Sequence, residues 1–335
     1  MNHEEIACTG FFRARPAAED APETISCLDA FQAEGPLQWV GGNLLEAVYN
    51  IPYALTHPGK WLDWVIWTGN DFDKLSLMRF VYYGGSVEFF FAVMLILLVV
   101  TVLGFAFNGF MWGCVRVLEG IANGVGRLFA WAGLIMVLQQ ILVIFMQRIF
   151  AVADISIGFG SIFTKSVSWW SEELKLYNAL VVCLCVSYTF VQGGHVRVDL
   201  IYSAVSGRAK RAIDMFGSIV FMMPAAVLIW MYSWYFLWRH LITPKPSASQ
   251  ALERYEMQAR AVRWNVETIG FSPQGFDAYF LFKVLLCAFT ALVFLQAIAF
   301  FYRSYLERKE GPESYGKYLD RDSLGAGEEA YEGTH

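Results

Sequence analysis

The sequence carries little charge for its length. Of its 335 residues, 16% are Asp, Glu, Lys or Arg and 56% are hydrophobic, whereas a soluble domain carries about 25% charged residues. The apolar residues form blocks of about twenty, the length that a helix needs to cross the hydrocarbon core of a bilayer. None of the blocks alternates as a membrane β-strand would. The expected fold class is therefore all-α, a polytopic integral membrane protein.

Several chemical signatures are missing as well. The six cysteines form no C-x-x-C pair, and we expect buried free thiols rather than metal ligands or disulfides. No lysine-rich tract, phosphate-binding loop, zinc-ligand spacing or nucleophile–base pattern occurs in the sequence. Axial haem ligation would need histidines inside spans, yet His195 and His240 only flank them. We therefore expect no enzyme activity, cofactor, metal site or nucleic-acid partner.

Five apolar segments are long enough to cross a membrane. They cover approximately Val87–Phe107, Leu128–Phe150, Leu174–Val191, Ala212–Trp238 and Phe276–Tyr302. Pro224 removes a backbone donor from the fourth segment and is expected to kink it. A sixth segment, Leu37–Leu55, contains Glu46 and Pro52. For this segment an interfacial helix is favoured over a span, and both interpretations stay open.

The distribution of Lys and Arg in short loops predicts the orientation. The loop between the third and fourth spans contains Arg197, Arg208, Lys210 and Arg211, which favours the cytoplasmic side. Alternation then places 150–173 and 239–275 in the periplasm and the tail after Tyr302 in the cytoplasm. The first eighty or so residues are external by the same rule, unless Leu37–Leu55 spans.

The predicted spans and loops divide the chain into four parts. Residues 1–85 form an extramembrane extension, with the interfacial helix at 37–55, and residues 86–126 form an extra span and a connector. Residues 127–303 form a four-span domain with a periplasmic insertion at 239–275, and residues 304–335 form a polar tail. The polar ends are expected to be poorly ordered. Two G-x-x-x-G patterns, at Gly109–Gly113 and Gly120–Gly124, fall in the connector, where we expect flexible turns.

Ionisable side chains inside spans are costly and therefore mark functional candidates. Lys283 lies about two turns into the fifth span, where its stem could reach the periplasmic interface or a partner on another helix or subunit. Gln139, Gln140 and Gln296 are expected to make interhelical hydrogen bonds. Carriers place their sites on broken helices within repeats. The sequence shows no such repeat and little intramembrane charge, which favours an accessory subunit.

A specific pattern surrounds the third span. Trp170-Ser171-Glu172-Glu173-Leu174 precedes it, and Gly193-Gly194-His195-Val196-Arg197-Val198-Asp199 follows it. This pattern resembles the small membrane subunit of tripartite ATP-independent periplasmic (TRAP) transporters, with its W-x-x-E-L entry and G-G-H-I/V-R-V-D loop. The likeness extends over roughly residues 125–305 and includes Asp214, Pro224, Ser233-Trp234, Lys283 and Arg303. Among the branches, it is most similar to those described for mannitol or chloroaromatic compounds.

The resemblance implies a transporter subunit in the bacterial inner membrane. Such a subunit would support a large TRAP membrane subunit, which holds the substrate and ion sites, within the lipid bilayer. A periplasmic solute-binding protein would deliver an organic acid or similar solute, and an ion gradient, with sodium the expected ion, would drive uptake. The alternative is a membrane anchor or haem-carrying subunit of a respiratory complex.

Seven residues are candidates for a subunit interface or a membrane anchor. They are Trp170, Glu172, Glu173, His195, Arg197, Asp199 and Lys283. Arg197 and Asp199 are too close in sequence for an i,i+4 helix pair, so they either pin an interfacial segment beside His195 or act as a positive-inside anchor and a helix cap. Glu172 and Glu173 either interact with the helix dipole at the start of the third span or contact a basic patch on a partner.

The sequence also departs from the family pattern. The connection 151–169 is long, and an insertion between the fourth and fifth spans includes a charged, amphipathic helix expected around Leu252–Thr268. The first 120 residues lie outside the usual four-span plan.

Overall fold

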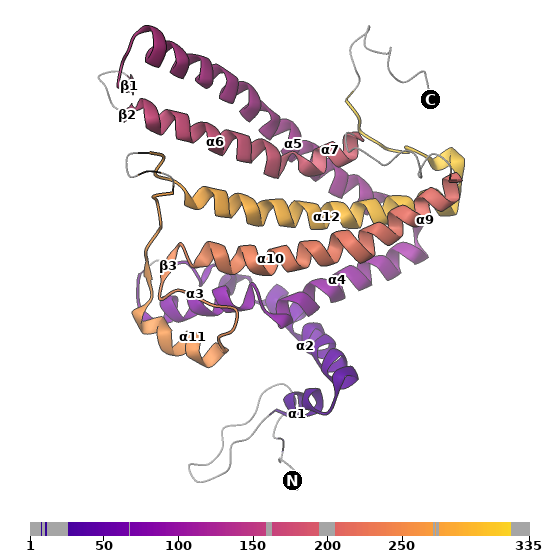
Figure 1. The fold of residues 1–335 in the computed structure, drawn as a ribbon. Helices are drawn as coiled ribbons and strands as arrows, with labels where there is room; N and C mark the ends of the chain where they lie inside the picture. The colour runs from indigo at the N-terminus through magenta and orange to yellow at the C-terminus, as the bar shows by residue number, and fades with distance from the viewer. Residues whose placement is uncertain are drawn as a thin grey trace. The chain divides into compact units, whose positions relative to one another are not determined.

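The chain folds into two compact units. The computed structural model describes residues 8, 11, 26–66, 68–158, 163–193, 205–270, 272 and 275–322. One unit comprises Met1–Leu103 and Pro246–Arg263, and the other comprises Gly104–Lys245 and Trp264–His335. The first will be called the N-terminal unit and the second the bundle unit (Figure 1).

The N-terminal unit is built from short helices and one apolar span. Its elements are α1 (Cys27–Ala33), α2 (Pro36–Thr56), η1 (Pro58–Leu62), α3 (Asp71–Tyr83), most of α4 (Val87–Ala106), α11 (Leu252–Gln258) and η4 (Ala259–Ala261). Polar side chains fix two helix starts, because Ser26 accepts a hydrogen bond from the Asp29 amide and Asn70 accepts one from the Asp73 amide. Such N-caps satisfy donors that the helix itself leaves free.

The core of the N-terminal unit joins segments far apart in the sequence. Leu77, Met78 and Val81 of α3 are fully buried, as is Tyr255 of α11. An ion pair of 2.7 Å joins Arg79 to Glu256. Helix α11 is shorter than expected: it ends at Gln258 and is followed by η4 and β4 (Arg263–Trp264). The prediction of one helix over Leu252–Thr268 was therefore wrong.

Cys8 and Cys27 form a disulfide in the N-terminal unit, with their Cα atoms 4.7 Å apart. The expectation of free thiols is wrong for this pair. Sequence spacing alone could not reveal the disulfide, because whether two cysteines 19 residues apart meet depends on the fold. Cys114, Cys183, Cys185 and Cys287 are free thiols.

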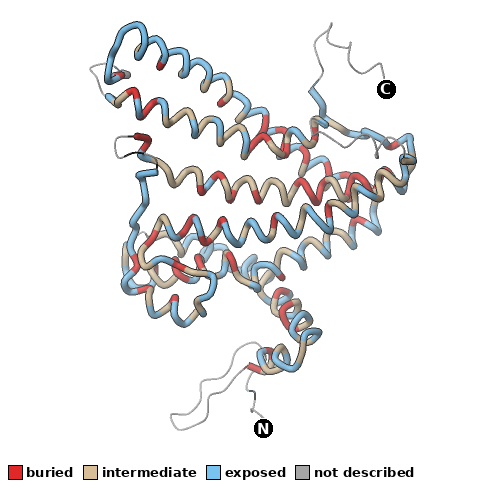
Figure 2. The backbone as a smooth tube through the Cα atoms, in the orientation of Figure 1, coloured by how far each residue is buried: buried red, intermediate tan, exposed pale blue. Residues whose placement is uncertain are grey.

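The bundle unit contains long helices around α12. Its elements are α5 (Asn108–Ile144), η2 (Phe145–Ile149), β1 (Asp154–Ile157), β2 (Phe163–Ser166), α6 (Val167–Leu184), α7 (Val186–Gln192), α9 (Gly207–Gly217), η3 (Ser218–Met222), α10 (Met223–Trp238), β3 (Ile242–Thr243), α12 (Phe280–Glu310) and η5 (Pro312–Ser314). Helix α12 lies between α6 and α10 and carries much of the buried surface (Figures 1 and 2). The strands β1 and β2 form an antiparallel hairpin, with Asp154 opposite Ser166.

Four of the five predicted spans are confirmed by length and composition among the described residues, and the third predicted span corresponds to a bent pair of helices that counts as a span only if the pair crosses as one. Four continuous helices qualify, at Val87–Ala106, Asn108–Ile149, Gly207–Trp238 and Phe280–Glu310. The bent pair is α6 and α7, with an angle of 45° at Cys185. The fourth span contains the π-helical turn η3 directly before Pro224, a local change of winding at the position where proline removes a backbone donor. The protein is an all-α polytopic membrane protein.

Helix α5 corrects the prediction for the connector. The helix begins at Asn108 rather than near Leu128, so both G-x-x-x-G patterns are helical and do not form turns. Added Cβ atoms at Gly120 and Gly124 would meet nothing within 4 Å. Gly126 is different, because its Cβ would lie 2.1 Å from Cβ of Tyr188 on α7. The close approach of α5 to α7 therefore requires a glycine at this position.

A matched pair of substitutions tests this contact. Gly126→Ala should destabilise the protein by about 1–3 kcal/mol, because α5 and α7 must separate. Gly124→Ala should be neutral or stabilise by up to about 1 kcal/mol, because alanine favours helix and has open space here. Thermal unfolding of the two variants in detergent makes the comparison. Equal transition temperatures would contradict the contact.

Candidate functional site

Trp170 lies in an apolar cluster at the end of the bundle unit where α6 begins. The buried members of this cluster are Val143, Ile155, Val167, Trp169, Trp170 and Phe276. The rings of Trp169 and Trp170 meet edge to face, with centroids 5.2 Å apart. Such aromatic pairs stabilise beyond their buried area. The cluster joins α5, the β1–β2 hairpin, α6 and the segment before α12.

Asp277 connects this cluster to the hairpin. Its carboxylate accepts a hydrogen bond from Lys165 Nζ and another from Trp169 Nε1, both at 2.9 Å. These two donors hold the pKa of Asp277 below its usual value, with Lys165 the larger cause. The charged form is therefore favoured, and the hairpin is held against the start of α12.

Glu172 holds the segment that precedes α12. Its carboxylate accepts hydrogen bonds from the Phe276 amide at 2.9 Å and from the Ser272 hydroxyl at 3.0 Å. A Cβ at Gly275 would lie 1.8 Å from Glu172 Oε2, so a larger residue there would displace the Glu172 carboxylate. Helix α6 begins at Val167 and has no acidic residue in its first turn. The helix-dipole interpretation of Glu172 and Glu173 was therefore wrong, because that effect falls off after the first turn.

Glu173 faces the neighbouring helix α5. It accepts hydrogen bonds from Gln139 Nε2 at 3.0 Å and from the Tyr177 hydroxyl at 3.3 Å. Gln139 also donates to the Trp170 carbonyl at 3.2 Å. The interhelical role predicted for Gln139 is thus confirmed. Glu172 and Glu173 both have partners within this chain, on different elements.

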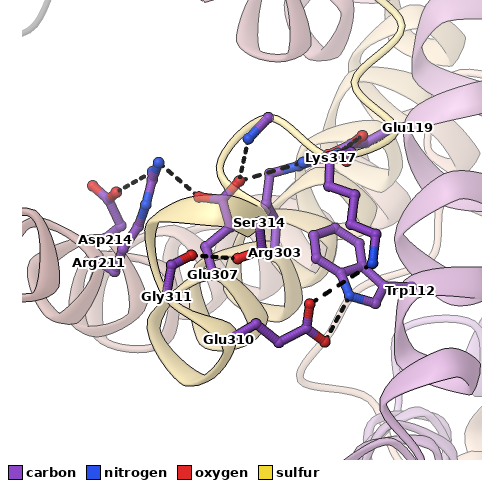
Figure 3. A network of polar contacts seen from close by, with 11 residues as sticks. Trp112, Glu119, Arg211, Asp214, Arg303, Glu307, Glu310, Gly311, Ser314 and Lys317 are labelled. Atoms are coloured by element: carbon purple, nitrogen blue, oxygen red, sulfur yellow. Dashed lines mark hydrogen bonds and ion pairs between the residues drawn. The ribbon is translucent and has the colours of Figure 1, made fainter.

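A buried ion network lies at the opposite end of the bundle unit (Figure 3). Arg303 on α12 donates two hydrogen bonds to the carboxylate of Glu119 on α5, at 2.6 and 2.5 Å. It also donates to Glu307 at 3.4 Å and to the Lys317 carbonyl at 3.0 Å. Arg303, Glu119 and Glu307 are 7%, 5% and 1% exposed. The planar guanidinium matches the carboxylate in two-point geometry.

Arg211 extends this network to α9. It forms an ion pair of 2.6 Å with Glu307 and one of 3.5 Å with Asp214. The Gly316 amide donates to Glu307 at 3.2 Å. The set Glu119, Arg211, Asp214, Arg303 and Glu307, called the Arg303 network from here on, joins three helices to the chain that follows α12.

Sequence reasoning missed Glu119 and Glu307. The expected spans ended at Tyr302 and began at Leu128, so both carboxylates were placed outside them. The i,i+4 spacing of Arg303 and Glu307 was a usable signal, since such residues are neighbours on a helix. The claim that the spans contain little buried charge is therefore wrong at this end of the bundle.

The C-terminal strap, residues 311–322, folds back along α5 and α7. Arg127 binds the carboxylate of Asp320 at 2.8 Å and that of Asp322 at 2.5 Å. The Asp322 amide donates to Gln192 Oε1 at 2.9 Å, and Asn123 donates to the Asp320 carbonyl at 2.8 Å. Part of the tail predicted to be poorly ordered is therefore held to α5 and α7 by hydrogen bonds and ion pairs.

Lys283 is buried between α10 and α12. Lys283 is 3% exposed, and its Nζ atom has no hydrogen-bond partner among the described residues. The ammonium lies 4.7 Å from the centroid of the Tyr279 ring and 5.2 Å from that of Phe236. Two cation–π contacts partly compensate the loss of hydration. One interpretation of the sequence was that the side chain reaches the periplasmic interface. In the structure the side chain does not extend to an exposed position.

Three of the seven candidates, His195, Arg197 and Asp199, lie outside the described residues. Gly193, which opens their motif, is described and ends α7 in the left-handed conformation with φ of 77°. This is the usual helix C-terminus for glycine. No group of three or more His, Cys, Asp or Glu residues in the described ranges could hold a metal ion.

The Arg303 network predicts a large and selective loss of stability. Arg303→Gln should destabilise the protein by about 3–5 kcal/mol, because it leaves Glu119 and Glu307 buried without their cation. Arg127→Gln should change global stability little, because this arginine and its partners are exposed and surface ion pairs contribute little. Unfolding of both variants in detergent checks the difference. Similar losses would contradict the burial of the network.

The pH dependence of the strap can also be predicted. Hydrogen bonds from Arg127, and for Asp322 first from Tyr188, hold the pKa values of Asp320 and Asp322 below their usual value. Their contribution is therefore present above the unfolded pKa of about 3.9 and is lost as the pH falls through the folded value. The protection of the strap amides against hydrogen exchange, measured relative to the intrinsic exchange rate at each pH, should be high at pH 7 and low near pH 3.

Neutral substitutions test the same contact without acid. Asp320→Asn combined with Asp322→Asn should expose the strap to trypsin after Arg321 at neutral pH. Glu313→Gln, a charge change in the same segment at a residue that is exposed, is the matched control. Unchanged cleavage in the double variant would show that these carboxylates do not hold the strap.

Residues 159–307 match the family model described as "Tripartite ATP-independent periplasmic transporters, DctQ component". The comparison with curated proteins and the comparison with solved structures each gave no match. The matched segment is somewhat less than half of the chain. It begins between β1 and β2, includes the last three spans, and ends at Glu307 of the Arg303 network. This part of the chain, a set of membrane helices pinned at both ends, is thus similar to a membrane component of a transporter.

Proposed function

We propose that this chain is the small membrane subunit of a TRAP transporter. The observation that carries the proposal is the family match over residues 159–307, the segment that holds α6, α7, α9, α10 and α12. Several charged side chains of these helices have partners within the chain at the two ends of the bundle unit: Glu172, Glu173, Arg211, Arg303 and Glu307. Such a fixed bundle suits a subunit that supports a partner rather than one that moves solute through its own spans.

In this proposal the chain lies in a bacterial inner membrane beside a large permease subunit. A periplasmic binding protein delivers an organic acid or a similar small solute, and an ion gradient, with sodium the expected ion, drives uptake. The resemblance to the mannitol and chloroaromatic branch does not identify the solute, because specificity would reside in the other two components.

One face of α10 is suited to contact the large subunit. Phe221 of η3 and Leu228 and Tyr232 of α10 are 65%, 59% and 80% exposed, and a spacing of seven and four residues places them along one side of the fourth span. They lie within the matched segment. Phe236, one turn further on, contacts the Lys283 ammonium. An acidic or carbonyl group of the large subunit that reached this edge would give Lys283 the partner it lacks among the described residues.

The remaining candidates are proposed as anchors at the two membrane surfaces. Trp170, Glu172 and Glu173 organise the end of the bundle that the Lys and Arg distribution places in the periplasm. His195, Arg197 and Asp199 would lie at the cytoplasmic surface. The Arg303 network belongs to that same end, because α12 crosses from one end to the other.

Bulk added to the α10 face tests the proposed contact. Leu228→Trp keeps the face apolar, so insertion should persist, but co-purification with the large subunit of the proposed transporter should fall several-fold. Leu98→Trp, at an exposed position of α4 outside the matched segment, is the control and should leave association unchanged. Equal association of the two variants would contradict the contact.

Lys283→Met separates assembly from folding. The isolated chain should be no less stable, because the substitution removes a buried charge that has no hydrogen-bond partner in the described chain. Association with the large subunit should weaken. A loss of stability in the isolated chain with normal association would overturn the role of Lys283.

A Soret band in the purified protein would contradict the transporter proposal and favour the haem-carrying alternative.

A further inference from the structure

Helix α2 exposes its apolar face instead of burying it. Leu37, Val48 and Leu55 are 85%, 54% and 66% exposed. Their spacings of eleven and seven residues correspond to about three and two helical turns, so the three side chains form one line along the helix. The helix as a whole is 21 residues long. It is not among the helices that qualify as spans by length and composition.

The polar side of α2 faces the N-terminal unit. Asn43 is 5% exposed and donates a hydrogen bond to the Trp39 carbonyl at 2.7 Å. Glu46 is half-buried, and its carboxylate accepts hydrogen bonds from Asn50 and Gln32. An amphipathic helix in water would be oriented the other way, with its polar side outward. The exposed side of α2 therefore suits an apolar environment.

Helix α2 is held close to the beginning of a span. The rings of Trp39 and Phe91 meet edge to face with centroids 5.4 Å apart. Phe91 lies four residues after Val87, the first residue of α4, or about 6 Å along the helix axis. Because α4 crosses the bilayer, this contact places α2 at the depth where α4 enters it.

Lysine and aromatic side chains, which are typical of the headgroup layer of a membrane, lie at the C-terminal end of α2. Lys60 donates a hydrogen bond to the Tyr53 hydroxyl at 2.7 Å, and Trp61 donates one to the Ala54 carbonyl at 2.9 Å. Trp61 is 57% exposed. Aromatic residues and lysines with apolar stems are enriched at this level of a membrane.

The contacts of α3 indicate on which side of the membrane the N-terminal segment, including α2, lies. Arg79 and Tyr82 of α3 contact Glu256 and Tyr255 of α11, so the N-terminal segment and the loop that contains α11 lie on one side of the membrane. The distribution of Lys and Arg places that loop in the periplasm. The Cys8–Cys27 disulfide is consistent with this side, because disulfides persist in oxidising compartments.

We propose that α2 lies in the headgroup layer of the periplasmic leaflet, with Leu37, Val48 and Leu55 against the acyl chains, and so seats the N-terminal unit on the bilayer. This inference goes beyond the transporter proposal and does not depend on the large subunit. The partner surface is phospholipid, which an interfacial helix binds through its buried apolar area.

Spin labels on the full-length protein test the proposal. Leu37→Cys, Val48→Cys and Leu55→Cys would be labelled in a background with the four free cysteines changed to alanine, and reconstituted in phosphatidylethanolamine–phosphatidylglycerol vesicles. Each label should be more accessible to oxygen than to a water-soluble nickel chelate, and all three should report one shallow depth. Asn50→Cys, on the half-buried polar side, is the control and should be less accessible to oxygen.

Other outcomes would overturn the proposal in distinct ways. A label at Val48 much deeper than those at Leu37 and Leu55 would mean that α2 spans the bilayer. Greater accessibility to nickel would mean that the face is in water, and low accessibility to both reagents would mean that protein covers it. In the same background, Gly59→Cys should react with a membrane-impermeant maleimide in intact spheroplasts. Reaction only after permeabilisation would place α2 on the cytoplasmic side.

Discussion

The bundle unit depends on the interaction between Arg303 and Glu119. A guanidinium that is 7% exposed donates two hydrogen bonds to a carboxylate that is 5% exposed, and Glu307 extends the contact to Arg211 on α9. Removing one charge would leave the others buried and uncompensated, a costly state in a low-dielectric environment. The positions of α5, α9, α12 and the strap are therefore coupled.

The opposite end of the bundle is fixed by different chemistry. Glu172 accepts hydrogen bonds from the segment before α12, Asp277 binds Lys165, and tryptophan rings fill the space between them. Between the two ends the helices are largely apolar, as a bilayer core requires. A bundle that is fixed at both ends and apolar between them agrees with the supporting role proposed above.

The fold was predictable where it follows from local composition. Four of the five predicted spans are continuous apolar helices long enough to cross a bilayer, so their existence and approximate positions followed from the sequence. Their ends did not, because hydropathy decreases at the first charged residues. Glu119 and Arg303 therefore appeared to lie outside the membrane helices, although they are paired and buried. The resemblance located Trp170, Glu172, Glu173 and Lys283, but not their partners.

Contacts between distant segments could not be read from a single sequence. The Cys8–Cys27 disulfide, the pairing of Glu172 with the Phe276 amide and the strap on Arg127 each depend on how the chain returns to itself. The exposure of the apolar side of α2 also depends on contacts with other segments. An interfacial helix was expected there, but which side faced the protein depended on α4 and on the hydrogen bonds of Asn43 and Glu46.

The most direct test of the account is solute uptake into proteoliposomes. Vesicles would contain the large subunit of the proposed transporter, with its binding protein outside, and an inward sodium gradient would be applied with and without this chain. We expect gradient-driven uptake only when this chain is present, and no uptake with the Arg303→Gln variant. Equal uptake in the absence of the chain would contradict its role as a transporter subunit.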